Sequence, residues 1–179
     1  AFKPAEGNIY IDADYSQVEL RVLAHISQDE NMIHAFNHGE DIHKQAASKV
    51  LGIPIEEVTK EQRSSAKAVN FGIVYGISDF GLANQLGVSN KQAKEYINQY
   101  LEKYQGIKHF MDDIVESAKA KGYVETLFGR RRYIPEIKSS NYMVRQFGSR
   151  VAMNTPIQRT AALSLKLSEI ELVKKITKD

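Results

Sequence analysis

The stretch RSSAKAVNFGIVYG, residues 63–76, decides how the fold of this sequence is interpreted. Four of its side chains recur every four positions and would form one face of a helix: Arg63, Lys67, Phe71 and Tyr75. Two cations followed by two aromatic rings make a poor core stripe, but they suit a ligand with a charged end and a flat end. The alternative is an ordinary amphipathic helix with both rings in the core, and the spacing alone does not separate the two.

Helical patterns extend on both sides of this stretch, and glycine or proline residues separate them. Ser16 is placed to cap a helix over 18–26, because its hydroxyl can accept a hydrogen bond from the first turn. From about residue 141 another helix is expected to run to the end of the chain, disturbed at Pro156, which has no backbone N–H. The remaining helices are expected at 29–37, 41–51, 60–76, 79–86, 89–104 and 107–121.

Two short segments have the character of strands. NIYIDADYS, which begins at residue 8, alternates apolar and polar side chains and predicts a half-buried strand over 8–14. YVETLFGRRRYIP, residues 123–135, has β-forming residues on both sides of a Phe-Gly pair and predicts a hairpin. The sequence therefore predicts a mainly α fold with a small β component.

The composition is that of a folded chain with an uneven distribution of charge. Of its 179 residues 42% are hydrophobic, and no apolar run reaches membrane-spanning length, so we expect a cytoplasmic protein with no membrane partner. Without cysteine, a metal would need carboxylate, carbonyl or histidine ligands. Residues 1–62 contain 5 Lys/Arg and 11 Asp/Glu, whereas residues 119–150 contain 8 and 2. The late basic cluster favours binding to nucleic acid over a set of solvated helix faces.

Several segments together resemble the family A DNA polymerases of the bacterial DNA polymerase I type. DYSQVELRVLAH (14–25) resembles their first palm motif, and residues 63–76 resemble the fingers helix that closes over the incoming nucleotide. GEDIHKQAA (39–47), GRRRYIPEI (129–137) and RVAMNTPIQ (150–158) follow the family's order. The resemblance implies a partial palm over 1–38, fingers over 39–138 and incomplete palm-proximal, duplex-binding helices over 139–179.

The resemblance also implies template-directed DNA synthesis by two-metal phosphoryl transfer, as part of a DNA-directed DNA polymerase working in replication and repair at the nucleoid. Asp14 would bind both Mg²⁺ ions, and the Tyr15 carbonyl would help to hold one of them. Lys67 would also protonate the leaving pyrophosphate. Taken alone, Asp14 is more often a capping or turn residue than a metal ligand.

The remaining roles that the resemblance implies concern the deoxynucleoside triphosphate and the primer-template DNA. Glu19 would be the steric gate against a ribose 2′ hydroxyl, while Phe71 would stack on the incoming sugar and base and Tyr75 near the templating position. Alone, Glu19 could be a solvated helix charge. The full set implied for the nucleotide is Tyr15, Gln17, Glu19, His43, Arg63, Lys67, Phe71 and Tyr75. The set implied for DNA is Arg132, Arg150, Asn154 and Gln158.

The sequence departs from the family pattern near its end. Arg159 and Leu163 replace a Gly and an Asp of a small-residue run, and no His-Asp-Glu motif with the second metal carboxylate follows. We therefore expect little or no polymerisation by this chain alone. Without neighbouring palm strands, the strand over 8–14 would have an open edge, through which self-association is expected.

Three interpretations of function remain open from the sequence. The first is part of a DNA polymerase that binds nucleotide but lacks complete catalytic machinery. The second is a non-catalytic DNA-binding module derived from a polymerase, with the basic surface but no need of a metal. The third is a structural helical domain that responds to neither DNA nor nucleotide.

Overall fold

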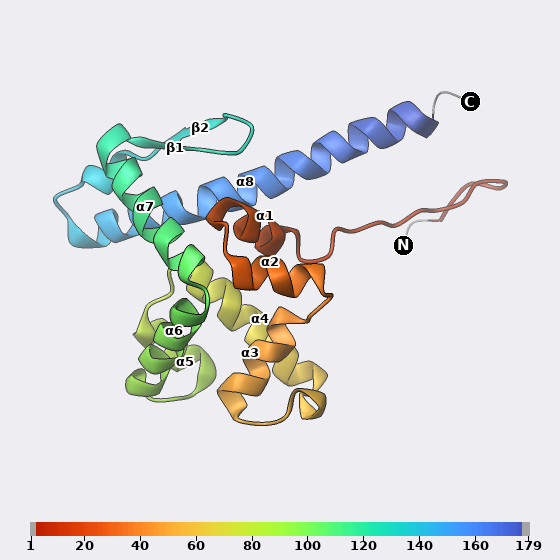
Figure 1. Ribbon diagram of the computed structural model, residues 1–179. Helices are drawn as coiled ribbons and strands as arrows, with labels where there is room; N and C mark the ends of the chain where they lie inside the picture. Colours follow the sequence, from red (N-terminus) through yellow and green to blue (C-terminus); the bar gives the residue numbers. More distant parts are fainter. Residues whose placement is uncertain (1–2, 177–179) are drawn as a thin grey trace.

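The fold is mainly α-helical with one small sheet, as the sequence predicts. The computed structural model describes residues 3–176, without the side chain of Val50 (Figure 1). Its helices are α1 Val18–Ser27, α2 Glu30–Asn37, α3 Ile42–Leu51, α4 Lys60–Val74, α5 Asp79–Leu86, α6 Asn90–Lys103, α7 Gln105–Lys121 and α8 Tyr142–Ile176. β1 Tyr123–Glu125 and β2 Arg131–Tyr133 form an antiparallel hairpin, and short 3₁₀ turns cover Ile55–Glu57 and Pro135–Lys138.

Local capping signals explain why these helices begin where they do. The Thr59 side chain accepts a hydrogen bond from the Gln62 backbone N–H, and the Gln62 side chain accepts one from the Thr59 backbone, which closes a capping box at the start of α4. Ser89 and Gln92 make the same box at α6, and Ser78 caps α5. Each predicted helix from α2 to α7 is confirmed within about two residues at either end.

The helix expected from about residue 141 is confirmed, because α8 continues through Pro156. A proline inside a helix costs roughly 3 kcal/mol, because it removes a hydrogen bond and crowds the preceding turn. Here Pro156 and its neighbours Thr155 and Ile157 are buried, and Ile157 belongs to the main core. Burial of this face stabilises the continuous helix against the local preference of proline. Residues 177–179, the end of the predicted terminal helix, lie outside the described residues.

The strand expected over 8–14 is also wrong. This segment is an exposed arm that extends away from the helices (Figure 1), with Ile9 88% and Ile11 71% exposed. Alternation supports a strand only where a neighbouring strand pairs with its backbone, and the described residues supply none here. The open strand edge expected to support self-association is therefore not formed. Ser16 does not cap α1 either, since the N-cap is Gln17 in the left-handed conformation (φ 53) without a side-chain cap.

The helices pack as two pairs and a supporting layer around one main core. α3 packs on α4 and α5 on α6, while α1, α7 and α8 contact one another and α8 also supports the hairpin (Figure 1). The main core joins these parts through residues such as Leu23, Ile73, Leu82, Tyr100 and Ile157. Within residues 3–176, no helix has the length and apolarity that crossing a membrane requires.

Candidate functional site

The candidate site is built on the outer face of α4. The exposed fraction of the Arg63 side chain is 39%, Lys67 is exposed, and the Lys67 Nζ atom lies 6.0 Å from the centre of the Phe71 ring. The Phe71 and Tyr75 rings lie 5.8 Å apart and are half-buried, each packing one side on the main core. The four side chains therefore form a continuous face with a cationic end and an aromatic end, and the rings are only partly in the core.

Asp41 holds Arg63 at the cationic end of this face. The Asp41 Oδ1 atom caps α3 by accepting hydrogen bonds from the backbone N–H groups of His43 (3.1 Å) and Lys44 (3.0 Å). The other oxygen, Oδ2, accepts a hydrogen bond from Arg63 Nε at 2.5 Å. Burial acts to raise the pKa of Asp41, but the hydrogen bonds from Arg63 and Lys44 outweigh it and lower this pKa. Arg63 is thus paired with a carboxylate at the cationic end of the face.

His43 lies beneath this face rather than on the surface. Its side chain is fully buried, and its Nδ1 atom lies 3.1 Å from the Asn70 amide nitrogen, a donor, so Nδ1 accepts and Nε2 carries the proton. Nε2 has no hydrogen-bond partner. Burial, and then the positive charge of Arg63, lower the pKa of His43 to about 4. The ring is therefore neutral at pH 7, and Nε2 is a buried donor without an acceptor.

The aromatic end of the face connects three helices. The Tyr75 hydroxyl donates a hydrogen bond to the Glu19 carboxylate of α1. Burial, followed by this carboxylate, raises the pKa of Tyr75, while the Gln158 side chain of α8 acts in the opposite direction. The structure therefore gathers Glu19, Tyr75 and Gln158, which the sequence assigned to different roles.

Arg150 and Asn154 of α8 lie close to the end of α4. A Cβ atom at Gly76, whose φ is +75, would come within 3.2 Å of the Arg150 side chain and 2.5 Å of Met153, so the chain can turn here only because the residue is glycine. The Asn154 Oδ1 atom is buried without a hydrogen-bond partner. Because α8 is continuous, Arg150, Asn154 and Gln158 share one face at four-residue spacing, as expected from the sequence. Arg132 reaches α8 from β2, where its guanidinium lies 3.3 Å from the Thr155 hydroxyl.

Asp14 and Tyr15 lie apart from the α4 face, at the end of the exposed arm. The Tyr15 hydroxyl lies 2.6 Å from the Ser168 hydroxyl of α8, and Asp14 lines an open hollow of about 340 Å³ beside the same helix, together with Glu169. Gln17 is half-buried with its Oε1 atom unpartnered. Within residues 3–176, no three His, Asp or Glu side chains come together as a metal site would require.

Comparisons with known proteins decide the family. The sequence model of DNA polymerase family A matches residues 1–179. This chain belongs to DNA polymerase family A. The DNA polymerase I of Caldicellulosiruptor bescii is 53% identical over 175 residues, which cover 98% of this chain and 21% of that protein. The DNA polymerase I of Bacillus subtilis is 54% identical over 177 residues, covering 98% of this chain and 20% of that protein. The chain thus spans about a fifth of the length of these relatives.

A solved structure of the family supports the same assignment. The polymerase domain of Pol1 from M. smegmatis, in complex with DNA primer-template and dNTP, superposes with a TM-score of 0.86 at 44% identity. The match covers 92% of this chain and 29% of that one. The likeness therefore extends beyond the isolated motifs to nearly the whole of this chain.

Two residues of the site were not found from the family resemblance or the sequence pattern. Asp41 lies in the matched segment 39–47 and occupies a capping position, but its contact with Arg63 spans 22 residues and needs the packing of α3 on α4. Asn70 lies inside α4, where its side chain fixes the tautomer of His43. The only signal in the sequence is that an amide side chain stands at a position on the buried face of α4. At the family departures, Arg159 and Leu163 are half-buried, and α8 is continuous through both positions.

Proposed function

We propose that this chain is the nucleotide-binding and adjoining duplex-binding part of a DNA-directed DNA polymerase that adds deoxynucleoside triphosphates to a primer 3′ end. In this proposal, residues 1–38 belong to the palm, residues 39–138 form the fingers and residues 139–179 lie beside the duplex. The observation that carries it is the single face of α4, with two cations, two aromatic rings and the unpartnered His43 donor beneath them. Because its substrate would be genomic DNA, the whole enzyme would work at the nucleoid.

The chemistry of this face suits a nucleoside triphosphate better than other anions. Arg63 and Lys67 would bind the phosphates, with Arg63 exchanging the Asp41 carboxylate for phosphate oxygens. His43 is neutral, so it would contribute one N–H hydrogen bond through Nε2 rather than a positive charge. Phe71 would present its exposed side to the sugar and base, and Lys67 would be the proton donor to the leaving pyrophosphate.

The aromatic end and α8 suit the primer-template. Glu19 is held by Tyr75, so the two would act together, with Glu19 excluding a ribose 2′ hydroxyl and Tyr75 facing the templating position. Arg132 and Arg150 would contact phosphates, which gives affinity without sequence preference. Asn154 and Gln158 would read minor-groove acceptors that all correct base pairs share.

The metal requirement of the reaction fits the described residues only in part. Asp14 and the Tyr15 carbonyl would be ligands for Mg²⁺ in the whole enzyme, where two ions would supply charge stabilisation for phosphoryl transfer. Residues 3–176 hold no group of three candidate ligands, so we derive no step through the metal. We propose that the chain by itself has little or no polymerase activity. Primer extension by the purified chain with Mg²⁺ and four nucleotides, at rates of ordinary polymerases, would overturn this.

Nucleotide binding by the α4 face can be measured without catalysis. We expect millimolar deoxynucleotide with Mg²⁺ to raise the melting temperature and to shift amide resonances of α4. The double variant Arg63→Ala, Lys67→Ala should lose both effects, because it removes the phosphate ligands. Lys91→Ala, Lys94→Ala, which removes two exposed cations of α6, is the matched control and should retain them.

The same measurements, together with a titration of the chain with duplex DNA, separate the alternatives. Salt-sensitive DNA binding without any response to nucleotide would favour a non-catalytic DNA-binding module. No response to either DNA or nucleotide would favour the interpretation as a structural helical domain. Either outcome would refute nucleotide binding by the α4 face.

A further inference from the structure

A small cavity lies between α3 and α6, on a face of α3 other than the one that carries His43. Its volume is about 20 Å³, enough for one water-sized group. Beside it lies an open hollow of about 240 Å³, and Lys49, Tyr96 and Gln99 line both. The two spaces are therefore neighbours that share part of their walls, and together they make up one candidate site.

Two tyrosines line this cavity, and their buried hydroxyls have no hydrogen-bond partner within the described residues. Tyr96 and Tyr100 line the cavity with 9% and 5% of their surface exposed, and both hydroxyl oxygens are buried. Leaving a buried polar group unpaired costs about 1–3 kcal/mol, and most such groups in proteins are paired with protein, water or ligand. These two O–H donors therefore lack an acceptor, and the residues that carry them also line the cavity.

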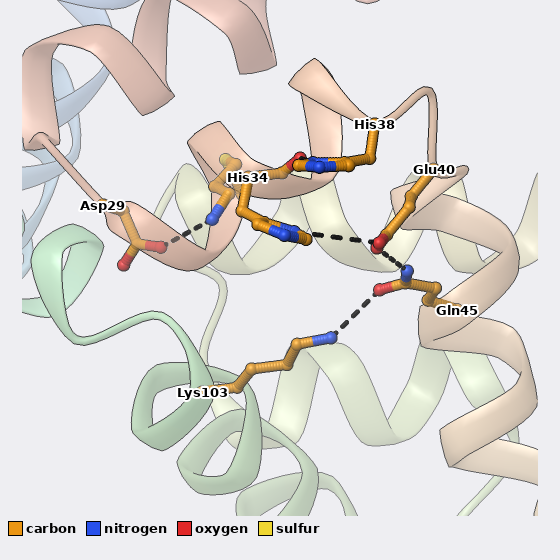
Figure 2. A network of polar contacts seen from close by, with 7 residues as sticks. Asp29, His34, His38, Glu40, Gln45 and Lys103 are labelled. Atoms are coloured by element: carbon orange, nitrogen blue, oxygen red, sulfur yellow. Dashed lines mark hydrogen bonds and ion pairs between the residues drawn. The ribbon is translucent and has the colours of Figure 1, made fainter.

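Two lysines also line this site. Lys103 Nζ donates a hydrogen bond to Gln45 Oε1 at 3.0 Å, and the Gln45 amide donates in turn to the Glu40 carboxylate, as Figure 2 shows. Glu40 therefore reaches Lys103 only through Gln45. Lys49 makes no ion pair with any described side chain. Burial, and then the charge of Lys49, lower the pKa of Lys103, while Glu40 and Asp29 oppose this effect.

The donors and the charges in this site favour one class of ligand. Its two cations are Lys49 and Lys103, and its uncharged polar side chains are hydroxyls and amides that can donate to an anion: Tyr96, Tyr100, Tyr104, Gln45, Gln92 and Gln99. The one carboxylate on the wall of the open hollow is Glu95. An anion would accept from the unpaired hydroxyls and relieve the repulsion between the two lysines, whereas a cation would do neither.

We propose that this site binds a small oxyanion such as inorganic phosphate, with one oxygen in the inner cavity between the Tyr96 and Tyr100 hydroxyls and the rest in the hollow beside Lys49 and Lys103. The ligand would join α3 to α6, which the Lys103–Gln45 hydrogen bond already bridges. The proposal is independent of nucleotide binding by the α4 face, because the two sites lie on different sides of α3.

The test is the melting temperature of the protein in rising inorganic phosphate at constant ionic strength. Wild type should gain a few degrees with saturation, and Tyr96→Phe, Tyr100→Phe, which keeps both rings, should lose this gain. Phosphate also stabilises proteins by exclusion from their surfaces. An equal rise in both proteins, or no rise in either, overturns the proposal.

A second pair of variants separates this site from the α4 face. Lys49→Met, Lys103→Met should abolish saturable phosphate binding in a calorimetric titration, whereas Lys67→Ala should retain it. If Lys67→Ala abolishes the binding and the double methionine variant keeps it, phosphate binds on α4 and the proposed site is wrong.

Discussion

In the proposed function, two acceptors compete for the charge of Arg63: the Asp41 carboxylate, with which it is paired, and the phosphates of a nucleotide. The ion pair is about one-third exposed on both sides, so it is worth only a fraction of a buried pair. It nevertheless has to break before Arg63 can bind phosphate. Asp41 therefore keeps the guanidinium in place and lowers its apparent affinity for an anion at the same time.

The first prediction follows from this competition. Asp41→Asn should tighten nucleotide binding about two- to fivefold, because an exposed ion pair of roughly 0.5–1 kcal/mol no longer has to break. The asparagine oxygen can still cap α3, so the melting temperature without ligand should change little. Asp79→Asn, in the first turn of α5, is the matched control. Weaker binding by Asp41→Asn in a calorimetric titration would show that Asp41 assists binding instead.

The second prediction concerns the pH dependence of His43. Its pKa is about 4 in the folded chain against 6.5 for an ordinary histidine, so between these values the unfolded chain binds more protons. The stabilisation that neutral His43 gives to the folded chain is therefore complete above about pH 6.5 and is lost as the pH falls towards 4. From pH 7 to pH 5 the free energy of unfolding should drop by about 2 kcal/mol through this residue. Urea unfolding of His43→Gln should show a shallower pH dependence, and an equal one would contradict the assignment.

At the scale of the element, the helices were predictable because their signals are local. Thr59 with Gln62, and Ser89 with Gln92, mark helix starts within four residues of sequence. The segment 8–14 has an equally clear strand pattern, but a strand needs a partner that local sequence cannot supply. The pairing of Glu19 with Tyr75 likewise depends on how α1 meets α4, 56 residues apart.

The contact between α1 and α4 should be measurable as a coupling energy. Glu19→Gln and Tyr75→Phe each weaken the hydrogen bond between the two side chains, so their effects on unfolding should not add. A double-mutant cycle should give about 1.5 kcal/mol of coupling, the low end for a hydrogen bond to a charged group. Phe36→Leu with Tyr75→Phe serves as a control cycle. Additive effects for Glu19 and Tyr75 would mean that the bond contributes nothing in solution.

The junction of α2 and α7 depends on a glycine that has no space for a side chain. A Cβ at Gly106 would lie 2.8 Å from the Asp29 Cα atom and 2.9 Å from the Ser27 carbonyl oxygen, both backbone atoms. Gly106→Ala should therefore lower the free energy of unfolding by about 1–3 kcal/mol. Gly72→Ala is the contrast, since its Cβ would meet only the Ile77 side chain at 3.3 Å and alanine favours the helix. Denaturant unfolding in which Gly106→Ala is no worse than Gly72→Ala would contradict this packing.

At the scale of the whole molecule, α8 connects the parts of the proposed DNA surface. It supports the hairpin that carries Arg132, packs Arg150 against the end of α4 and presents Gln158 beside Tyr75. A duplex along α8 would therefore meet the aromatic end of the α4 face. This arrangement needs the helix to continue through Pro156, which only the tertiary packing of that region secures.

The last prediction tests this surface through the salt dependence of DNA binding. Each phosphate contact that a cation makes with duplex DNA contributes about 0.9 to the slope of log affinity against log salt concentration. Arg132→Ala, Arg150→Ala should therefore flatten the slope by about 1–2 and weaken binding to all sequences alike. Lys91→Ala, Lys94→Ala removes the same charge from α6, away from α8, and should leave the slope near that of wild type. Because net charge falls equally in both variants, a slope that changes equally in both would mean that DNA responds to overall charge, and α8 would lose its assignment as the duplex-binding surface.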